Sequence, residues 1–258
     1  MAITQNHKAD KAINNLLSRQ DYLITQANDL ARSFGNLTTF QHKVLDFCFS
    51  YVQADDTQAK VYRMNALDII RQFGLGTSGA SYVRVAKAFK ALNENTAIYM
   101  RIERDGHSGI MMTSLFDHIS MLDDGRMEFQ FSSKVAPYIF QLKKRFYSFK
   151  LSELSRVRSK YTLALMKLWN ANSAGKLTDA CIQGTLEDWE SWFIGSDENG
   201  KPKELTAGIF KRDILNRALK ELGELYPKTV FDLTTIKNGR SVVGYRLDIH
   251  PIRTNVPM

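Results

Sequence analysis

The chain passes twice through the same order of expected elements, and this repeat constrains its fold more than any other feature of the sequence. In each half, three stretches with apolar residues at helical spacing precede apolar or alternating stretches, the last two of which are joined by a glycine-containing turn. Matching helices are expected to start near residues 38 and 159, 65 and 185, and 80 and 205, an offset of about 120 residues. A chain of 258 residues has room for two domains of that size, so the repeat predicts two similar domains.

Local signals place the ends of these elements. Thr38 or Thr39, Asn65, Ser159 and Thr185 each stand just before an apolar helical stretch, where a side-chain oxygen can accept a hydrogen bond from the first helical turn. Third helices are expected over residues 79–93 and 206–222. Strands are expected at 97–103, 110–122, 127–132, 229–236 and 241–249, with hairpin turns at 123–126 and 237–240.

Three helices followed by a β-hairpin form the layout of a winged-helix domain, which is a variant of the helix-turn-helix. The sequence therefore predicts an α+β fold with two tandem winged-helix domains related by pseudo-symmetry. The expected divisions are an N-terminal tail or arm at 1–25, a first domain at 26–145 and a second domain at 146–258.

Positive charge is concentrated in one segment. The net charge of the chain is +8. Residues 143–176 hold nine bases and the single acid Glu153, so the net charge of this segment equals that of the whole chain. Solvated surfaces usually mix charges of both signs, so this segment favours contact with nucleic acid over a plain solvated helix face.

The third helix of each half is the candidate recognition helix. On a helical wheel, Val85 and Phe89 lie on an apolar face opposite Arg84 and Lys87, and the helix at 206–222 divides in the same way. Arginine and lysine can bind guanine or phosphate, and asparagine can make two hydrogen bonds to adenine. An ordinary amphipathic surface helix is the alternative, but two such helices in matching places favour DNA binding.

The predicted DNA-binding residues come from four places in the sequence. They are Ser81, Arg84, Lys87 and Lys90 in the first recognition helix; Lys143, Lys144, Arg145, Arg158 and Lys160 in the basic segment; Lys201, Lys203, Thr206, Lys211, Arg212, Asn216 and Lys220 in or before the second recognition helix; and Lys237 and Arg240 at the second hairpin tip. Arg104 and His107 lie between the strands expected at 97–103 and 110–122, at a hairpin tip of the first half, and are further candidates for phosphate contact.

Two stretches resemble the replication initiators of iteron-type, theta-replicating plasmids. Residues 210–222, FKRDILNRALKEL, and residues 159–168, SKYTLALMKL, are similar to two helices of that family, and weaker likeness runs from about residue 27 to residue 249. The sequence departs from the family pattern at Asp213, where a base is common, at Arg217, where proline is common, and at Met166, where tyrosine is usual.

The resemblance implies binding to double-stranded DNA with direct repeats, called iterons, at a replication origin. It also implies recruitment of host replication proteins, and a homodimer that represses its own promoter in equilibrium with a DNA-binding monomer that initiates. The tandem recognition helices can enter successive major grooves, which predicts a duplex site of roughly 20 bp.

The sequence favours neither an enzyme nor a membrane protein. No two histidines stand two residues apart, as a nicking initiator requires, and no phosphate-binding loop or hydrolase motif occurs. No apolar run is long enough to span a membrane, and the N-terminus lacks the apolar core of a signal peptide. We therefore expect a cytoplasmic protein with no catalytic residue, cofactor, metal or membrane partner. Cys48 and Cys181 are expected to be buried thiols.

Two other functions stay open at this point. One is a winged-helix transcriptional repressor without a replication role, and the other is an interaction module whose basic face binds an acidic protein. Direct repeats beside the coding sequence favour an initiator, and a lone inverted repeat favours a repressor. Steep loss of DNA affinity with salt would argue against the interaction module.

Overall fold

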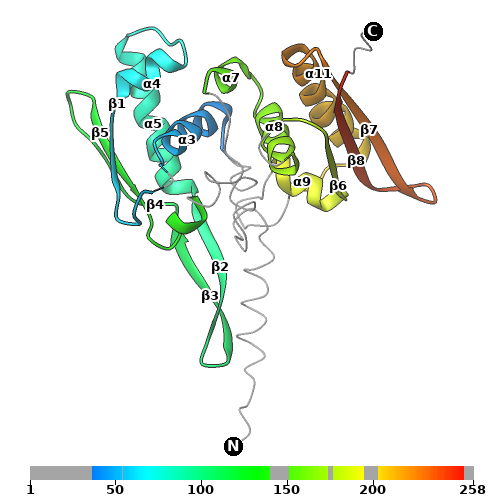
Figure 1. The fold of residues 1–258 in the computed structure, drawn as a ribbon, viewed down its shortest axis with the longest axis horizontal. Coiled ribbons are helices and arrows are strands. Elements are labelled where there is room, and N and C mark those ends of the chain that lie inside the picture. The colour runs from blue at the N-terminus through cyan, green and yellow to red at the C-terminus, as the bar shows by residue number, and fades with distance from the viewer. Residues whose placement is uncertain (1–36, 54, 140–150, 174–176, 195–202, 253–258) are drawn as a thin grey trace, which may run out of the picture.

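The computed structural model describes residues 37–53, 55–139, 151–173, 177–194 and 203–252. They form two domains that lie side by side, with helices of each domain in contact near the centre of the molecule (Figure 1). Each domain has its own core: one cluster of buried side chains runs from Leu37 to Ile139 and the other from Leu154 to Ile249.

The first domain contains helices and strands in winged-helix order. Its elements are α3 (Thr39–Ser50), β1 (Val61–Asn65), α4 (Ala66–Gln72), α5 (Gly79–Asn95), β2 (Ala97–Arg104), β3 (His107–Ser114), β4 (Phe116–Met121) and β5 (Arg126–Phe131). Strands β1, β5 and β4 form an antiparallel sheet in that order, and β2 and β3 form a separate two-stranded ribbon.

The predicted caps position the first two helices. Thr38 and Gln41 form a reciprocal capping box at the start of α3, and Asn65 and Asp68 form another at the start of α4. Each box satisfies two backbone N–H groups that would otherwise lack a partner. These caps fix where the apolar face of each helix begins and so which side chains enter the core.

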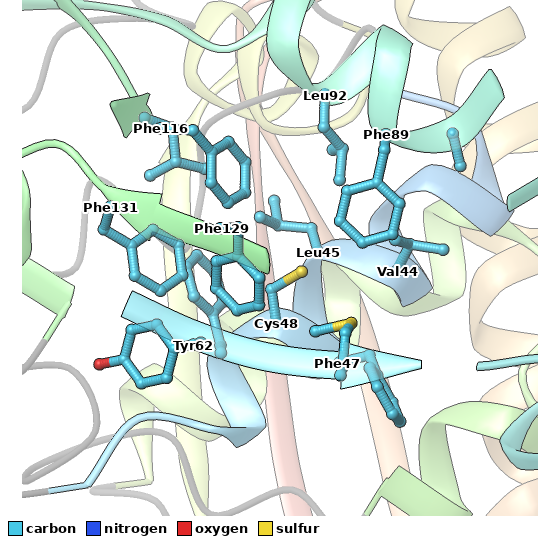
Figure 2. Close-up of a cluster of buried hydrophobic side chains, with 14 of the residues drawn as sticks. Val44, Leu45, Phe47, Cys48, Tyr62, Phe89, Leu92, Phe116, Phe129 and Phe131 are labelled. Carbon is cyan, nitrogen blue, oxygen red and sulfur yellow. The ribbon is translucent and has the colours of Figure 1, made fainter. Parts of the chain in front are cut away.

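Aromatic side chains of the sheet form the centre of the first core (Figure 2). Phe129 of β5 stacks on Tyr62 of β1 with ring centroids 5.1 Å apart, and Phe116 stacks on Phe131 at 5.2 Å. Apolar residues of α3 and α5 cover this layer, and burial of each large side chain stabilises the fold by about 1.5–3 kcal/mol. The face of α5 opposite the core is thereby turned outward.

The second domain repeats the same order. Its elements are α7 (Leu151–Arg156), α8 (Lys160–Asn172), β6 (Ala180–Thr185), α9 (Leu186–Ile194), a long helix made of α10 (Ala207–Phe210), the π-helical turn η1 (Lys211–Leu215) and α11 (Asn216–Leu225), then β7 (Thr229–Asn238) and β8 (Ser241–Pro251). The sheet order is β6-β8-β7, which matches β1-β5-β4 of the first domain strand for strand. The shared order shows the expected pseudo-symmetry.

Two strands were not predicted. Strand β1 pairs with β5, and β6 pairs with β8; each of the two strands ends directly before the first residue of the next helix. Both are only five or six residues long, so their sequences show little alternation on their own. Pairing with a strand far along the chain, which local sequence does not reveal, makes them part of the sheet.

The single strand predicted over residues 110–122 was wrong. Strands β3 and β4 divide at Leu115, whose buried backbone N–H donates to the carbonyl oxygen of Thr96 at 3.0 Å. The wing of the first domain is therefore the hairpin β4–β5, and the ribbon β2–β3 is an insertion before it. Arg104 and His107 lie at the tip of this inserted ribbon, away from the wing where they were expected.

One of the two cysteine predictions was also wrong. Cys48 is buried in the first core, but Cys181 is exposed on β6. Successive strand side chains point to opposite faces, and the adjacent Ile182 takes the inward position. Trp169 and Trp189 are core residues of the second domain, and Trp192 is partly buried against that core. Among the described residues, none of the helices has the length and apolar content required to cross a bilayer.

Candidate nucleic-acid interface

Helix α5 presents a basic outer face. Arg84, Lys87 and Lys90 are exposed and Ser81 is half-buried, whereas Val85 and other apolar residues on the opposite side are buried. Lys90 forms an ion pair with Glu94 one turn further along the helix. The predicted division of α5 into a buried apolar face and an exposed basic face is confirmed. The cations in the N-terminal half of the helix face outward.

A groove of about 550 Å³ separates α5 from the first turn of α3. Its walls carry Arg84 and Lys87 on one side and Thr38 and Thr39 on the other. The Arg84 guanidinium lies over the ring of Phe40, 4.3 Å from the ring centroid, which orders this long side chain. Two cations beside a helix N-terminus form an arrangement that can hold a phosphate group.

The helix α10–η1–α11 is the second outward-facing element. Its buried side is made by Phe210, Ile214, Leu215, Ala218 and Leu222. Arg212, Asn216 and Lys220 are exposed on the other side, and Lys203 and Thr206 are exposed just before the helix. Lys211 differs from these residues because it is half-buried and its ammonium group donates to the hydroxyl of Thr235 on β7 at 3.0 Å.

Arg212 makes a two-point contact with its neighbour Asp213. Its Nε donates to Oδ1 at 2.9 Å and its Nη2 donates to Oδ2 at 2.8 Å. These hydrogen bonds hold the pKa of Asp213 below its usual value. Arg217, one turn later, places Nη2 3.9 Å from the same carboxylate. The pair lies inside the π-helical turn, in which the backbone N–H of Asn216 donates to the carbonyl oxygen of Lys211.

The two wings differ in charge. Lys237 and Arg240 are exposed at the tip of β7–β8, where Gly239 adopts a φ of +59° that permits the tight turn. At the tip of β4–β5, by contrast, Asp124 binds Arg126 through hydrogen bonds to its backbone and side chain. The second wing is thus the better candidate for contact with phosphates.

In the described part of residues 143–176, the bases do not all face outward, because Lys167 is buried, which corrects the expectation for that residue. Lys143, Lys144 and Arg145 lie outside the described residues, as does Lys201 before the second recognition helix. Arg158 is exposed near Glu221 and Glu224, at 3.9 and 3.7 Å, and Lys160 is half-buried beside the ring of Tyr161. Lys167 points inward, away from any external partner.

Lys167 joins the two domains through a buried ion pair. Its Nζ lies 2.9 Å from Oδ1 of Asp46 on α3, and the two side chains are 6% and 0% exposed. Nearby, the ammonium group of Lys43 donates to the carbonyl oxygen of Ser155 in α7 at 2.9 Å. These cross-domain contacts were not predicted. The available signal was an ionisable residue inside an apolar helical stretch, in α3 and again in α8.

Glu221 connects the second recognition helix to this junction. Its carboxylate accepts hydrogen bonds from the backbone N–H groups of Arg158 and Ser159 and from the hydroxyl of Thr162, at 2.6 to 3.2 Å. Burial lowers the pKa of Lys43; the charge of Glu221 opposes this shift and the charge of Arg84 adds to it. Both recognition helices therefore carry charges close enough to act on Lys43.

The geometry agrees with comparisons to known proteins. Residues 23–170 match a family model described as Initiator Replication protein, WH1, and residues 186–249 match one described as Initiator Rep protein, WH2. No curated protein matches the chain.

Solved structures that share the fold include two that cover most of this chain. One is the Pi initiator protein in complex with iteron DNA, with a TM-score of 0.65 and 17% sequence identity over 86% of this chain and 94% of that chain. The other is domains 2 and 3 of RctB, with a TM-score of 0.53 and 13% identity over 84% of each chain. The two family models together cover most of the sequence, in the order of the two winged-helix domains seen in the structure. The chain belongs to the family of replication initiator proteins with two winged-helix domains.

Proposed function

We propose that the protein initiates plasmid replication by binding directly repeated duplex sites, or iterons, through both recognition helices. The observation that carries the proposal is the pair of outward-facing helices, α5 and α10–η1–α11, each braced by a buried apolar side. A protein of similar fold, the Pi initiator, was crystallised with iteron DNA, which supports the same class of ligand for this chain.

Within this proposal the exposed residues have different roles. Arg212 and Asn216, on the outer face of the second helix, are the candidates for contact with base edges. Lys87 in the groove beside α3, Lys203 and Thr206 before the second helix, and Lys237 at the wing tip are candidates for phosphate contact, which positions the protein without reading sequence. The wider set proposed for the interface also includes Ser81, Arg84, Lys90, Arg158, Lys160, Lys211, Lys220 and Arg240.

We place the boundary between the domains in the stretch from Ile139 to Leu154, because side chains before it belong to one core and side chains after it belong to the other. Melting of the origin would follow from the binding and bending of DNA by many copies and would require no reaction by the protein. Recruitment of host replication proteins, and promoter repression by a homodimer in equilibrium with the monomer, complete the proposal on the strength of the family resemblance.

Footprinting on the DNA that flanks the gene tests the proposal. Protection of several direct repeats, each roughly 20 bp with contacts in successive major grooves, is the expected result. Protection of a lone inverted repeat at the promoter would support a repressor instead. Binding that loses less than about tenfold in affinity between 50 and 200 mM salt would contradict extensive phosphate contact, since six or more contacts predict about 10³-fold.

A further inference from the structure

We propose that Asp213 determines sequence specificity by holding the Arg212 guanidinium in position to read one guanine. The inference rests on the proposed function and adds a residue to it: an acid in the first part of the second recognition helix, where the other charged residues are basic. Between residues 206 and 220, Asp213 is the only acid in the sequence.

The geometry of the pair leaves the reading edge of the arginine available. A guanidinium has five N–H donors, and Asp213 takes one on Nε and one on Nη2, both on the same edge. The remaining edge, formed by Nη1 and the second N–H of Nη2, presents two parallel donors. Guanine offers two acceptors, O6 and N7, with matching spacing in the major groove. Asp213 therefore binds Arg212 without competing for the groups that would contact the base.

The arginine is exposed, and its contact with Asp213 favours one orientation. Its side chain is 71% exposed, and the two hydrogen bonds to one carboxylate restrict the orientations of the guanidinium plane. A side chain ordered before binding loses less conformational entropy when the complex forms. The carboxylate at the same time repels DNA phosphates, so it lowers affinity for random sequence. Both effects increase the difference between a site with guanine and a site without it.

The competing explanation is that Asp213 only neutralises charge. In that case its removal would increase affinity for all DNA alike and leave base preference unchanged. Asp232 provides a matched control, because it is an exposed acid on β7, in the same domain but outside the recognition helix. Asp232→Asn changes the net charge of the protein by the same amount as Asp213→Asn.

The experiment selects bound sequences from a pool of randomised duplexes with the full-length protein and with the variants Arg212→Ala, Asp213→Asn and Asp232→Asn. We expect the wild-type motif to contain one guanine whose preference is lost in Arg212→Ala. At that same position Asp213→Asn should lower the preference for guanine by about tenfold, within the range that a two-point arginine contact provides. Asp213→Asn should also bind random duplex more tightly, whereas Asp232→Asn should retain the wild-type motif.

A second measurement replaces the selected guanine by 7-deazaguanine, which removes the N7 acceptor. The loss of affinity should be large for the wild type and small for Asp213→Asn. Circular dichroism should show the same folded content in all variants, because both side chains of the pair lie on the surface.

Three results would overturn the inference. One is an unchanged guanine preference in Asp213→Asn, another is equal weakening at every position of the motif, and the third is an Arg212→Ala motif identical to the wild type. Each of these leaves the proposed function standing as long as the wild-type protein enriches a motif. A wild-type protein that enriches no motif at all would instead contradict the proposed function.

Discussion

Replacing Lys167 by methionine removes the cation that faces Asp46 while filling most of the same volume. The Asp46 side chain is fully buried in the folded protein, so its charge would remain between the two domains without a lysine partner. Breaking a buried pair from one side destabilises proteins by about 3–5 kcal/mol, because the remaining charge has lost water and gained no new partner. With the total stability of a typical protein at about 5–15 kcal/mol, the loss should be easy to measure.

Urea unfolding followed by fluorescence suits this test. All three tryptophans lie between residues 169 and 192, so the fluorescence signal reports the second domain, and far-ultraviolet circular dichroism reports both domains. We expect the urea midpoint to fall sharply for Lys167→Met with little change in slope. The matched control is Arg63→Met, which breaks an exposed pair with Glu128 at 3.6 Å and should cost less than about 1 kcal/mol.

A double variant separates the charge from the packing. Asp46→Leu combined with Lys167→Met replaces the whole pair by apolar groups and should recover most of the lost stability. A cost below about 1 kcal/mol for Lys167→Met alone would refute the reasoning, because it would mean that water reaches Asp46 once the lysine is gone. A double variant as unstable as the sum of the two single variants would refute it as well.

Three further outcomes are expected. Gly244→Ala should destabilise the second domain by about 3 kcal/mol or more, since an added Cβ would lie 2.2 Å from the carbonyl oxygen of Gly184 on the paired strand. The control is Gly223→Ala on α11, where an added Cβ meets nothing within 4 Å. The urea midpoint should fall for Gly244→Ala and should rise or stay constant for Gly223→Ala. Burial raises the pKa of the Glu190 carboxyl, so the folded state binds the carboxyl proton more tightly than the unfolded state. The stability of the protein should therefore fall as pH rises from the ordinary carboxyl pKa through the folded-state pKa. Glu190→Gln should remove that fall in urea midpoints measured between about pH 5 and about pH 7, and an unchanged pH profile would show that Glu190 does not cause it. Lys87→Ala should weaken specific and random duplex equally and reduce the slope of log affinity against log salt by about one; a loss confined to the specific site would place Lys87 on a base edge instead.

Helix positions were largely predictable from the sequence because their signals are local. A capping residue such as Thr38 or Ser159 lies within three positions of the backbone groups that it satisfies, and apolar spacing identifies the buried face of α5. The outward positions of Arg84 and Arg212 follow from that spacing as well.

Features that depend on distant partners were missed. Strand β1 is defined by its pairing with β5, more than 60 residues later, and no nearby residue indicates this. Lys167 was counted with the nine bases of residues 143–176, and its pairing was missed because its partner, Asp46, lies in the other domain. The π-helical turn in the second recognition helix also has no signature in the residue types of 211–215, yet it contains the contact between Arg212 and Asp213.

The hydrogen bonds from Glu221 to the start of α8, together with the pair between Lys167 of α8 and Asp46 of α3, have a consequence for the DNA. They connect one recognition helix to the other domain through groups with little freedom to move, so the protein sets the distance and rotation between its two reading elements. One extra base pair in the middle of a site turns the far groove by about 34° and moves it by about 3.4 Å. An insertion of half a helical turn should therefore abolish simultaneous engagement, and lengthening the site by a full turn should not restore it.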